Sequence, residues 1–588
     1  MNIIITRVKR RLFYLLTILS IIILSLLSIS NSKFIFSRKL RTAPEYEPKK
    51  IDNNNNNNEN NILKYNKEIL LNKDEKFEYV DPEVKNNTDY NNDHNQLEYD
   101  NINNQEILLN QDENFEYIDI EVKNITESSN NQKILQSKDE NFENVNPEVK
   151  KATINILLNN IKKPLKVEEF IELKEREELH TALWNSIFGE IDISTNDNNT
   201  LYEYKKKLIE NSKFLNGKDL DGLTESKKLL VTIHQSLYPW LYGYHYKSFT
   251  DLIQSYKGRG IVVCTGDYHF KYTRSTIDIL RNIINCTLPI EVFYNGYNDL
   301  SRENQDILRK FDNVYVNDIS KYYNNDIVNA TGWAIKPYAI LASRFEEVIL
   351  IDADVIYIRD PVELFEEKGY LDRGTLFFRD RSLLLGENNG TRWLKQWMSD
   401  PLPETKELRF WKEESYHEME SSTVVMHKTK TLLGLLNTCK LNEYRYRQDV
   451  VYKMVYGDKE TFWMGFDMAR QHYYMSPDPC AFVGEIIESY KKKEKIICGH
   501  NGHLLRNGKL MFWNGHLVKD KNKNGANMKL INIDGYYLDH GNENWSPGLD
   551  CIYITKTSNE TIRFNEEEKN IINRIFNREN QVHYLVPH

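Results

Sequence analysis

The feature that most constrains the fold is a regular alternation of apolar segments and amphipathic helices between residues 258 and 355. Short β-branched and leucine runs are separated by segments of about ten residues with helical periodicity. This order predicts an α/β domain built on a parallel sheet. The predicted strands are residues 261–264, 288–296, 313–318 and 346–355, and the predicted helices between them are 275–285, 302–311 and 334–345.

An acidic pair follows the fourth predicted strand. Residues 348–351 are apolar without polar alternation, which is typical of a strand buried on both faces. Asp352 and Asp354 come next, at the strand end where α/β sheets bind ligands. Carboxylates at i and i+2 can face one hard cation, which would bridge the oxygens of a diphosphate. The alternative is that one aspartate caps a turn and the other is solvated.

The N-terminus predicts a membrane anchor. Four cationic residues between positions 7 and 11 precede about eighteen largely apolar residues, enough for one bilayer crossing. We expect a cytosolic tail at 1–11 and a signal anchor at 12–30, giving a type II membrane protein in the secretory lumen. A cleavable signal peptide, whose apolar core is usually shorter, is the alternative.

The remaining chain divides by composition. Residues 31–150 are rich in Asn, Asp, Glu and Lys and carry three related segments at unequal spacing, which predicts a disordered stalk. Residues 151–256 have helical periodicity and predict a helical lead-in to a domain at 257–588. The six cysteines lack CxxC spacing, so disulfides are favoured over a zinc site. The net charge of -9 argues against a nucleic-acid partner.

Common nucleotide motifs are absent from the sequence. No GxxxxGK[ST] loop occurs, and residues 258–267 lack GxGxxG after their strand. P-loop and Rossmann dinucleotide enzymes are thereby disfavoured. A diphosphate would be held mainly through a metal ion, which indicates nucleotide-sugar chemistry.

Seven sequence blocks resemble the fungal Golgi α-mannosyltransferases of the α-1,3/α-1,2 type. They are GRGIVVCTGD (258–267), LPIEVFYNG (288–296), WAIKPYAILASRFEEVILIDAD (333–354), DPVELF (360–365), LFFRDR (376–381), GDKETFWMGF (457–466) and GHLLRNGKLMFWNG (502–515). The resemblance implies a GT-A-like nucleotide-sugar-binding fold, GDP-mannose as donor, manganese as the ion and retention of configuration. It also implies a Golgi membrane location with a lumenal catalytic domain.

Within that family the chain is more similar to the α-1,3 branch than to the α-1,2 branch. The implied acceptors are glycoproteins or oligomannose chains that end in mannose on N- or O-glycans, and a transferase complex is a possible partner. A transferase that uses UDP-galactose or UDP-glucose is one alternative. A non-catalytic lumenal subunit that binds glycan or another transferase is an alternative of a different class.

The resemblance assigns roles to the acidic pair and to a distant histidine. Asp352 and Asp354 are expected to bind the metal ion and the diphosphate. His503 is the best match to the family's third metal ligand, with His500 and His516 as alternatives.

Further residues are expected at the donor nucleotide. Thr265 and Gly266 follow the first strand, where the base and ribose are expected, and Gly266 otherwise marks a turn. Trp333 and Lys336 open the helix before the acidic pair, where the lysine would meet a phosphate or remain solvated.

The remaining candidates are carboxylates expected at the sugars. Asp458 and Glu460 would bind sugar hydroxyls, with helix capping by Asp458 as the alternative. Glu420 is the candidate nucleophile or stabiliser of the reacting carbon, although its flanking residues depart from the family's Gln-Glu-Ser-Gly. Asp380 competes for this role, and the sequence does not choose between them.

Overall fold

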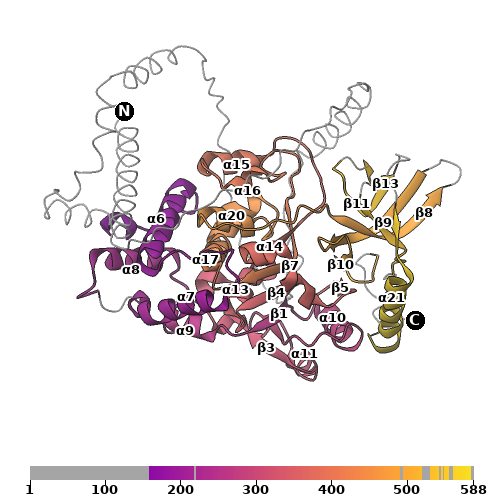
Figure 1. Cartoon of the computed structure of the whole chain (residues 1–588), viewed down its shortest axis with the longest axis horizontal. Coiled ribbons are helices and arrows are strands. Elements are labelled where there is room, and N and C mark those ends of the chain that lie inside the picture. The colour runs from indigo at the N-terminus through magenta and orange to yellow at the C-terminus, as the bar shows by residue number, and fades with distance from the viewer. Residues whose placement is uncertain are drawn as a thin grey trace, which may run out of the picture. The chain divides into compact units, whose positions relative to one another are not determined.

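A six-stranded sheet organises the computed structural model (Figure 1). In spatial order its strands are β3 (Val314–Asp318), β2 (Ile290–Tyr294), β1 (Arg259–Cys264), β4 (Glu347–Ile351), β7 (Met419–His427) and β6 (Thr375–Arg379). The first four run parallel, and β7 is antiparallel to both β4 and β6. The predicted α/β class and its four parallel strands are therefore confirmed.

The structure describes only part of the chain, and all described residues belong to one unit. The predicted tail, anchor and stalk, residues 1–150, lie outside the described residues. Those described are 158–216, 220–489, 494–519, 530–541, 544–546, 548–554 and 561–583.

The two faces of the six-stranded sheet carry different hydrophobic clusters. Successive side chains of a strand point to opposite faces, and Ile261 and Val263 accordingly belong to one cluster while Val262 belongs to another. The cluster with Val262 also contains α13 and the N-terminal helices, so the helical lead-in and the sheet share one core. The helices between the parallel strands are α10 (Phe270–Asn282), α11 (Arg302–Leu308), α12 (Asn325–Val328) and α13 (Ile335–Ala342).

The helical lead-in includes four of the α-helices that the structure describes. They are α6 (Phe170–Phe188), α7 (Asn198–Asn211), α8 (Glu225–Leu237) and α9 (Phe249–Ser255). The side chains of Asp197, Thr224 and Ser248 each accept a hydrogen bond from a first-turn N–H and so begin α7, α8 and α9.

A second sheet begins directly after the acidic pair. The short strand β5 (Val355–Tyr357) pairs antiparallel with β10 (Leu510–Asn514), which pairs with β9 (Glu494–Leu504). The acidic pair therefore lies in the turn that joins the two sheets. The other strands of the second sheet are β8 (Ala481–Ser489), β11 (Gly535–Leu538), β12 (Asn544–Trp545), β13 (Cys551–Ile554) and β14 (Ile562–Arg563).

One disulfide links this second sheet internally. Cys498 on β9 is bonded to Cys551 on β13, which confirms the preference for disulfides over zinc. The four other cysteines are free thiols: Cys264, Cys286, Cys439 and Cys480.

The helix α21 (Glu566–Arg578) connects the C-terminal part to α10, the first helix after β1. Asn565 and Glu568 form a capping box at its start. At its end Arg578 makes two hydrogen bonds, of 2.6 and 2.9 Å, to Asp278 on α10. The remaining helices are α14 (Lys368–Arg373), α15 (Asn389–Trp397), α16 (Pro403–Lys406), α17 (Leu432–Leu441), α18 (Tyr444–Tyr446), α19 (Tyr452–Met454) and α20 (Thr461–Met468).

The predicted localisation requires a correction. Among the described residues, no helix combines the length and the apolar character that a bilayer crossing needs. This finding contradicts the expected single-pass type II Golgi membrane protein, and that localisation is not retained. The predicted anchor, residues 12–30, lies outside the described residues.

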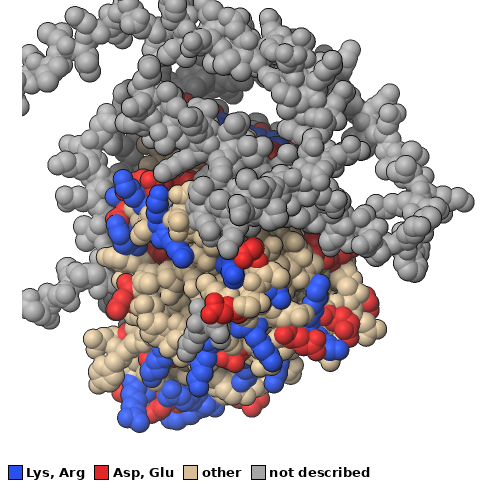
Figure 2. Space-filling model, turned by 90° about the vertical axis from the view of Figure 1, so that its left-hand side faces the viewer, with Lys and Arg blue, Asp and Glu red and all other residues tan. Residues whose placement is uncertain are grey.

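The surface of the described part carries both signs of charge. On the face that Figure 2 shows, lysine and arginine side chains alternate with aspartate and glutamate rather than forming one large field. This mixture is in keeping with the modest net charge of -9 over the chain.

Candidate active site

The acidic pair is held in place through its backbone. The N–H of Asp352 donates to the carbonyl of Ser422 on β7 at 2.8 Å. The hydroxyl of Thr276 on α10 donates to the carbonyls of Ala353 and Val355 at 2.9 and 3.1 Å. The N–H groups of Gly515 and His516 donate to the carbonyl of Asp354 at 3.1 and 2.7 Å. The backbone of the turn is therefore fixed from both sheets and from α10.

Lys336 connects the acidic pair to a third aspartate. Its ammonium lies 2.8 Å from Oδ1 of Asp352 and 3.9 Å from Oδ2 of Asp458. It also donates to the hydroxyl of Ser421 at 3.2 Å, and that hydroxyl donates to Asp458 at 3.2 Å. Lys336 is buried, so the solvated alternative for this residue is wrong.

This group of residues has an excess of negative charge. Burial raises the pKa of Asp352 to about 6, the charges of Asp354 and Glu420 act in the same direction, and Lys336 opposes them. Burial alone would lower the pKa of Lys336, but the charges of Asp352 and Asp458 outweigh it and hold that pKa above its usual range. A further cation would be stabilised here, because the carboxylates outnumber the ammonium group.

A second charged group lies at the end of β6. The ammonium of Lys459 is 2.6 Å from Oδ2 of Asp380 and 2.7 Å from Nδ1 of His417. The amide of Asn501 donates to Oδ1 of Asp380 at 3.2 Å. Burial opposes the ionisation of Asp380, but Lys459 and Arg381 outweigh it and hold its pKa far below the usual range. Asp380 is therefore a carboxylate already neutralised by an ammonium ion.

Glu420, near the start of β7, is the centre of a third group. It accepts hydrogen bonds from the N–H and the hydroxyl of Ser422 and from the amide of Asn514 at 2.9 Å. Nε2 of His503 lies 3.2 Å from its Oε2. Burial would raise the pKa of Glu420, but the hydrogen bond and charge of His503 outweigh it and lower that pKa. Glu420 is thus held ionised.

His503 does not join the acidic pair. Its ring lies between Phe378 and Phe512, with ring centroids 5.0 Å from each, and it faces Glu420. The two alternatives are also engaged elsewhere: His500 faces the carbonyl of Val518, and His516 faces the hydroxyl of Ser275.

The described residues contain no group of three His, Cys, Asp or Glu side chains placed to hold a metal ion. Two carboxylates on one turn nevertheless fit a divalent ion such as magnesium, which keeps several waters and takes its other ligands from substrate phosphates. The metal-binding roles of Asp352, Asp354 and His503 stay predictions.

The other predicted residues lie around these groups. The hydroxyl of Thr265 accepts a hydrogen bond from Thr273 at 2.7 Å. A Cβ on Gly266 would lie 2.3 Å from Oδ1 of Asp299, so the glycine permits a close contact within the protein. Glu460 is fully buried, and its oxygens accept from two backbone N–H groups and from the indole of Trp463. Glu460 therefore positions the start of β7.

Sequence reasoning missed several residues that the fold brings to the site. Lys459 lies inside the quoted block GDKETFWMGF, so its charge between two acids was a usable signal. His417 and Ser421 lie beside the predicted Glu420 in the sequence, whereas Asn501 and Asn514 come from distant segments and carry no local signal.

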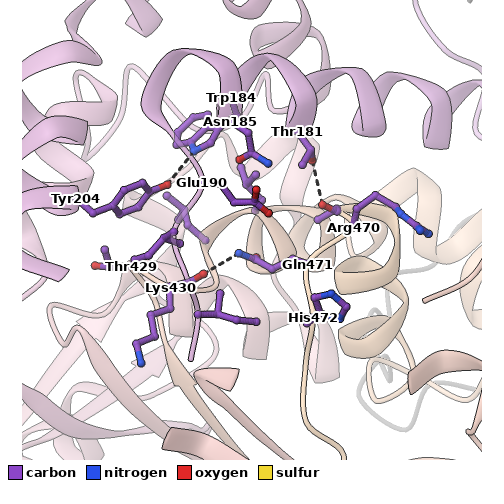
Figure 3. A pocket seen from close by; sticks show the side chains of 15 residues that line it. Thr181, Trp184, Asn185, Glu190, Tyr204, Thr429, Lys430, Arg470, Gln471 and His472 are labelled. Carbon is purple, nitrogen blue, oxygen red and sulfur yellow. Dashed lines mark hydrogen bonds between the residues drawn. The ribbon is translucent and has the colours of Figure 1, made fainter. Parts of the chain in front are cut away.

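A pocket with an empty volume of about 570 Å³ lies elsewhere (Figure 3). It is lined by parts of α6, the turn after β7 and the end of α20. In its wall Trp184 donates to the hydroxyl of Tyr204 at 3.3 Å, and Gln471 donates to the carbonyl of Lys430 at 2.7 Å. Glu420 lies near the start of β7, and Lys430 lies in the turn after its end, so about 23 Å of strand separates Glu420 from this turn. The pocket contains none of the predicted site residues.

Comparison with known families identifies the central segment. Residues 258–504 match the family described as "Mannosyltransferase putative". We call this matched segment the mannosyltransferase domain, after the family to which it is similar. It contains the acidic pair, Lys336, Asp380, Glu420, Asp458 and His503. Asn514 and the turn at Gly515 lie just beyond it.

The curated proteins that are similar to this chain are named as mannosyltransferases. The chain is 27% identical over 357 residues to "Putative alpha-1,3-mannosyltransferase MNN14" of Candida albicans, covering 51% of this chain and 49% of that protein. It is 26% identical over 312 residues to alpha-1,3-mannosyltransferase MNT3 of Saccharomyces cerevisiae, covering 46% and 48%. The chain spans about half or less of the length of the curated relatives it matches.

Solved structures give weaker matches to this chain. The bifunctional glycosyltransferase WbbM is 11% identical with a TM-score of 0.26, covering 51% of this chain and 59% of that one. The galactosyltransferase LgtC is 13% identical with a TM-score of 0.25, covering 35% and 70%. At these TM-scores the matches carry no argument about the site.

Proposed function

We propose that this chain is a retaining, metal-dependent mannosyltransferase with a GT-A-like fold. It would move mannose from GDP-mannose to mannose-terminated glycans and form an α-1,3 linkage, as the names of its curated relatives suggest. The observation that supports this most is the gathering of five buried or half-buried carboxylates with two lysines inside the mannosyltransferase domain. The carboxylates are Asp352, Asp354, Asp380, Glu420 and Asp458, and the lysines are Lys336 and Lys459.

Asp352 and Asp354 would hold the divalent ion. Such an ion, when bound, supplies positive charge to the diphosphate that leaves. Lys336 keeps its proton and keeps Asp352 in place from within the protein. Asp458 and Ser421 hold the ammonium of Lys336 from the other side. These residues therefore position the leaving group and do not need to transfer a proton themselves.

Transfer with retention breaks the bond between the anomeric carbon and the phosphate oxygen and forms a bond from that carbon to an acceptor oxygen, whose proton passes to the leaving diphosphate. A carboxylate must stabilise the positive charge that develops on the sugar or attack it. We assign this role to Glu420, which is ionised and contacts Ser422, Asn514 and His503 through hydrogen bonds. Asp380 is less suited, because the ammonium of Lys459 already neutralises it.

The test is a transfer assay with the purified full-length chain, GDP-mannose, manganese and an α-mannobioside acceptor. We expect a product with a new α-1,3-linked mannose by NMR, and less transfer when UDP-galactose or UDP-glucose replaces the donor. A new α-1,2 linkage, or preference for a UDP-sugar, would contradict the proposed specificity. Absence of transfer from every donor, with intact glycan binding, would favour the non-catalytic alternative.

Variants separate the metal hypothesis from folding. Asp352→Ala combined with Asp354→Ala should reduce transfer to background while the circular dichroism spectrum persists. Asp306→Ala is the matched control, because Asp306 pairs with Arg309 at an exposed helix site. Unchanged transfer by the double variant would remove the acidic pair from the mechanism.

A further inference from the structure

Two aromatic side chains are exposed side by side next to the acidic group, which comprises Asp352, Asp354 and Asp458 around Lys336. The rings of Trp333 and Tyr456 have centroids 5.4 Å apart and are tilted by 43°. Trp333 is 38% exposed and Tyr456 is 56% exposed. Leaving large aromatic side chains in water costs free energy. A ligand that covers both exposed rings would therefore bury apolar surface.

A glycine allows the loop that carries Tyr456 to lie close to Trp333. Gly457 has φ +66°, and a Cβ at this position would lie 2.8 Å from the Trp333 ring. Only glycine adopts this conformation readily and lets the backbone come this close to the indole. The loop that carries Tyr456 is therefore fitted against Trp333.

The pair adjoins the acidic group in both sequence and space. Trp333 precedes Lys336 by one helical turn, and Tyr456 precedes Asp458 by two residues. The ring of Tyr456 meets the ring of His417 at 5.7 Å, and the ammonium of Lys459 lies 5.4 Å from the Tyr456 ring.

Its polar neighbours place the pair on one side of the sheet. Through Lys459 the pair is linked to Asp380, at the end of the edge strand β6. Thr265 and Gly266, where the nucleotide is expected, follow β1 on the other side of β4. The aromatic pair therefore lies toward the side of the acidic group away from the expected nucleotide.

We propose that Trp333 and Tyr456 form the platform on which the terminal sugar of a mannose-terminated acceptor stacks; this rests on the proposed function. A pyranose ring presents C–H groups on one face, which the negative face of an aromatic ring attracts. Its hydroxyls need polar partners at the edge, and His417, Lys459 and Asp380 supply both donors and acceptors there. This assigns Trp333 to the acceptor in place of the expected nucleotide role.

The first test is equilibrium binding of α-mannobioside to the full-length chain by ligand-observed NMR, which does not depend on catalysis. We expect Trp333→Ala and Tyr456→Ala each to weaken binding at least tenfold, and Trp333→Phe to keep most of it. Tyr202→Ala is the matched control, because Tyr202 is an exposed aromatic residue on α7. Equal binding by the parent, Trp333→Ala and Tyr456→Ala would overturn the proposal.

The second test separates the acceptor from the donor. In the transfer assay Trp333→Ala should raise KM for α-mannobioside at least tenfold and leave KM for GDP-mannose and donor hydrolysis within about twofold. A rise in KM for GDP-mannose alone would overturn the proposal and return Trp333 to the nucleotide. If the parent binds α-mannobioside through Trp333 but uses no donor, the proposed function fails while the glycan platform stands.

Discussion

The ammonium of Lys336 lies 2.8 Å from the carboxylate of Asp352, and both groups are largely removed from water. The sequence suggested a phosphate partner for this lysine, yet the protein itself supplies the partner. The contact keeps one positive charge among several carboxylates. Asp354 and Glu420 raise the pKa of Asp352, and Asp458 raises the pKa of Lys336. Lys336 therefore compensates the charge of these carboxylates within the protein itself.

Lys336→Met should destabilise the protein by about 3 kcal/mol, because it leaves buried carboxylates without their cation. Urea unfolding measures this free energy. Lys321→Met is the matched control, since Lys321 pairs with Asp318 at 3.5 Å but is 76% exposed, and it should cost less than about 1 kcal/mol. Equal stability of the two variants would show that Lys336 is not needed to compensate the acids.

His503→Ala should change the behaviour of Glu420 and leave the metal requirement alone. Without the histidine the pKa of Glu420 rises, so the acidic limb of the pH profile of kcat/KM moves to higher pH. The manganese concentration for half-maximal activity should stay within about twofold. His540→Ala, at an exposed position, is the control. A tenfold higher manganese requirement with an unmoved acidic limb would instead make His503 a metal ligand.

Glu177→Gln should remove a pH dependence from the helical lead-in. Burial raises the pKa of Glu177 from 4.5 to about 8, and its Oε2 meets the hydroxyl of Tyr238 at 2.8 Å. The native state holds this proton between pH 4.5 and 8 while the unfolded state releases it, so stability is full below about pH 4.5 and falls as pH rises toward 8.

The glutamine variant should therefore lose less stability than the parent from pH 5 to pH 8, by up to about 1 kcal/mol per pH unit. Urea unfolding at several pH values checks this slope. Glu210→Gln, on the exposed side of α7, should leave the slope as it is. Parallel slopes for the parent and Glu177→Gln would mean that Glu177 is ionised in the native state.

Cys498→Ala combined with Cys551→Ala should lower the unfolding free energy by about 3 kcal/mol, because the bond closes a loop with a sequence separation of 53 in the unfolded chain. Thermal unfolding with and without a reducing agent measures the effect. The reductant should destabilise the parent and leave the double variant unchanged. Identical melting of the oxidised parent and the variant would show that the bond adds no stability.

Local periodicity was enough to predict the parallel half of the main sheet. Each strand from β1 to β4 is an apolar run next to its own helix, so its neighbours in the sequence define it. The second sheet was not predicted, since β5 has three residues and finds its partner β10 more than 150 residues later. Such pairing depends on register between distant segments and leaves little trace in composition.

The site residues also divide into those that local sequence predicts and those that depend on distant segments. Asp352 and Asp354 were found because they follow a buried strand, and Asp458 because it lies in a recognisable block. His503 is predicted as a metal ligand from the resemblance to the family, and this role stays a prediction. Its contact with Glu420 spans 83 residues and is set by where β9 and β10 place it against β7.

The turn at residues 352–354 is all that separates β4 in one sheet from β5 in the other. Any rotation of one sheet relative to the other must change the conformation of this turn or of the strands beside it. A change in the angle between the sheets would therefore change the geometry of the turn that carries Asp352 and Asp354.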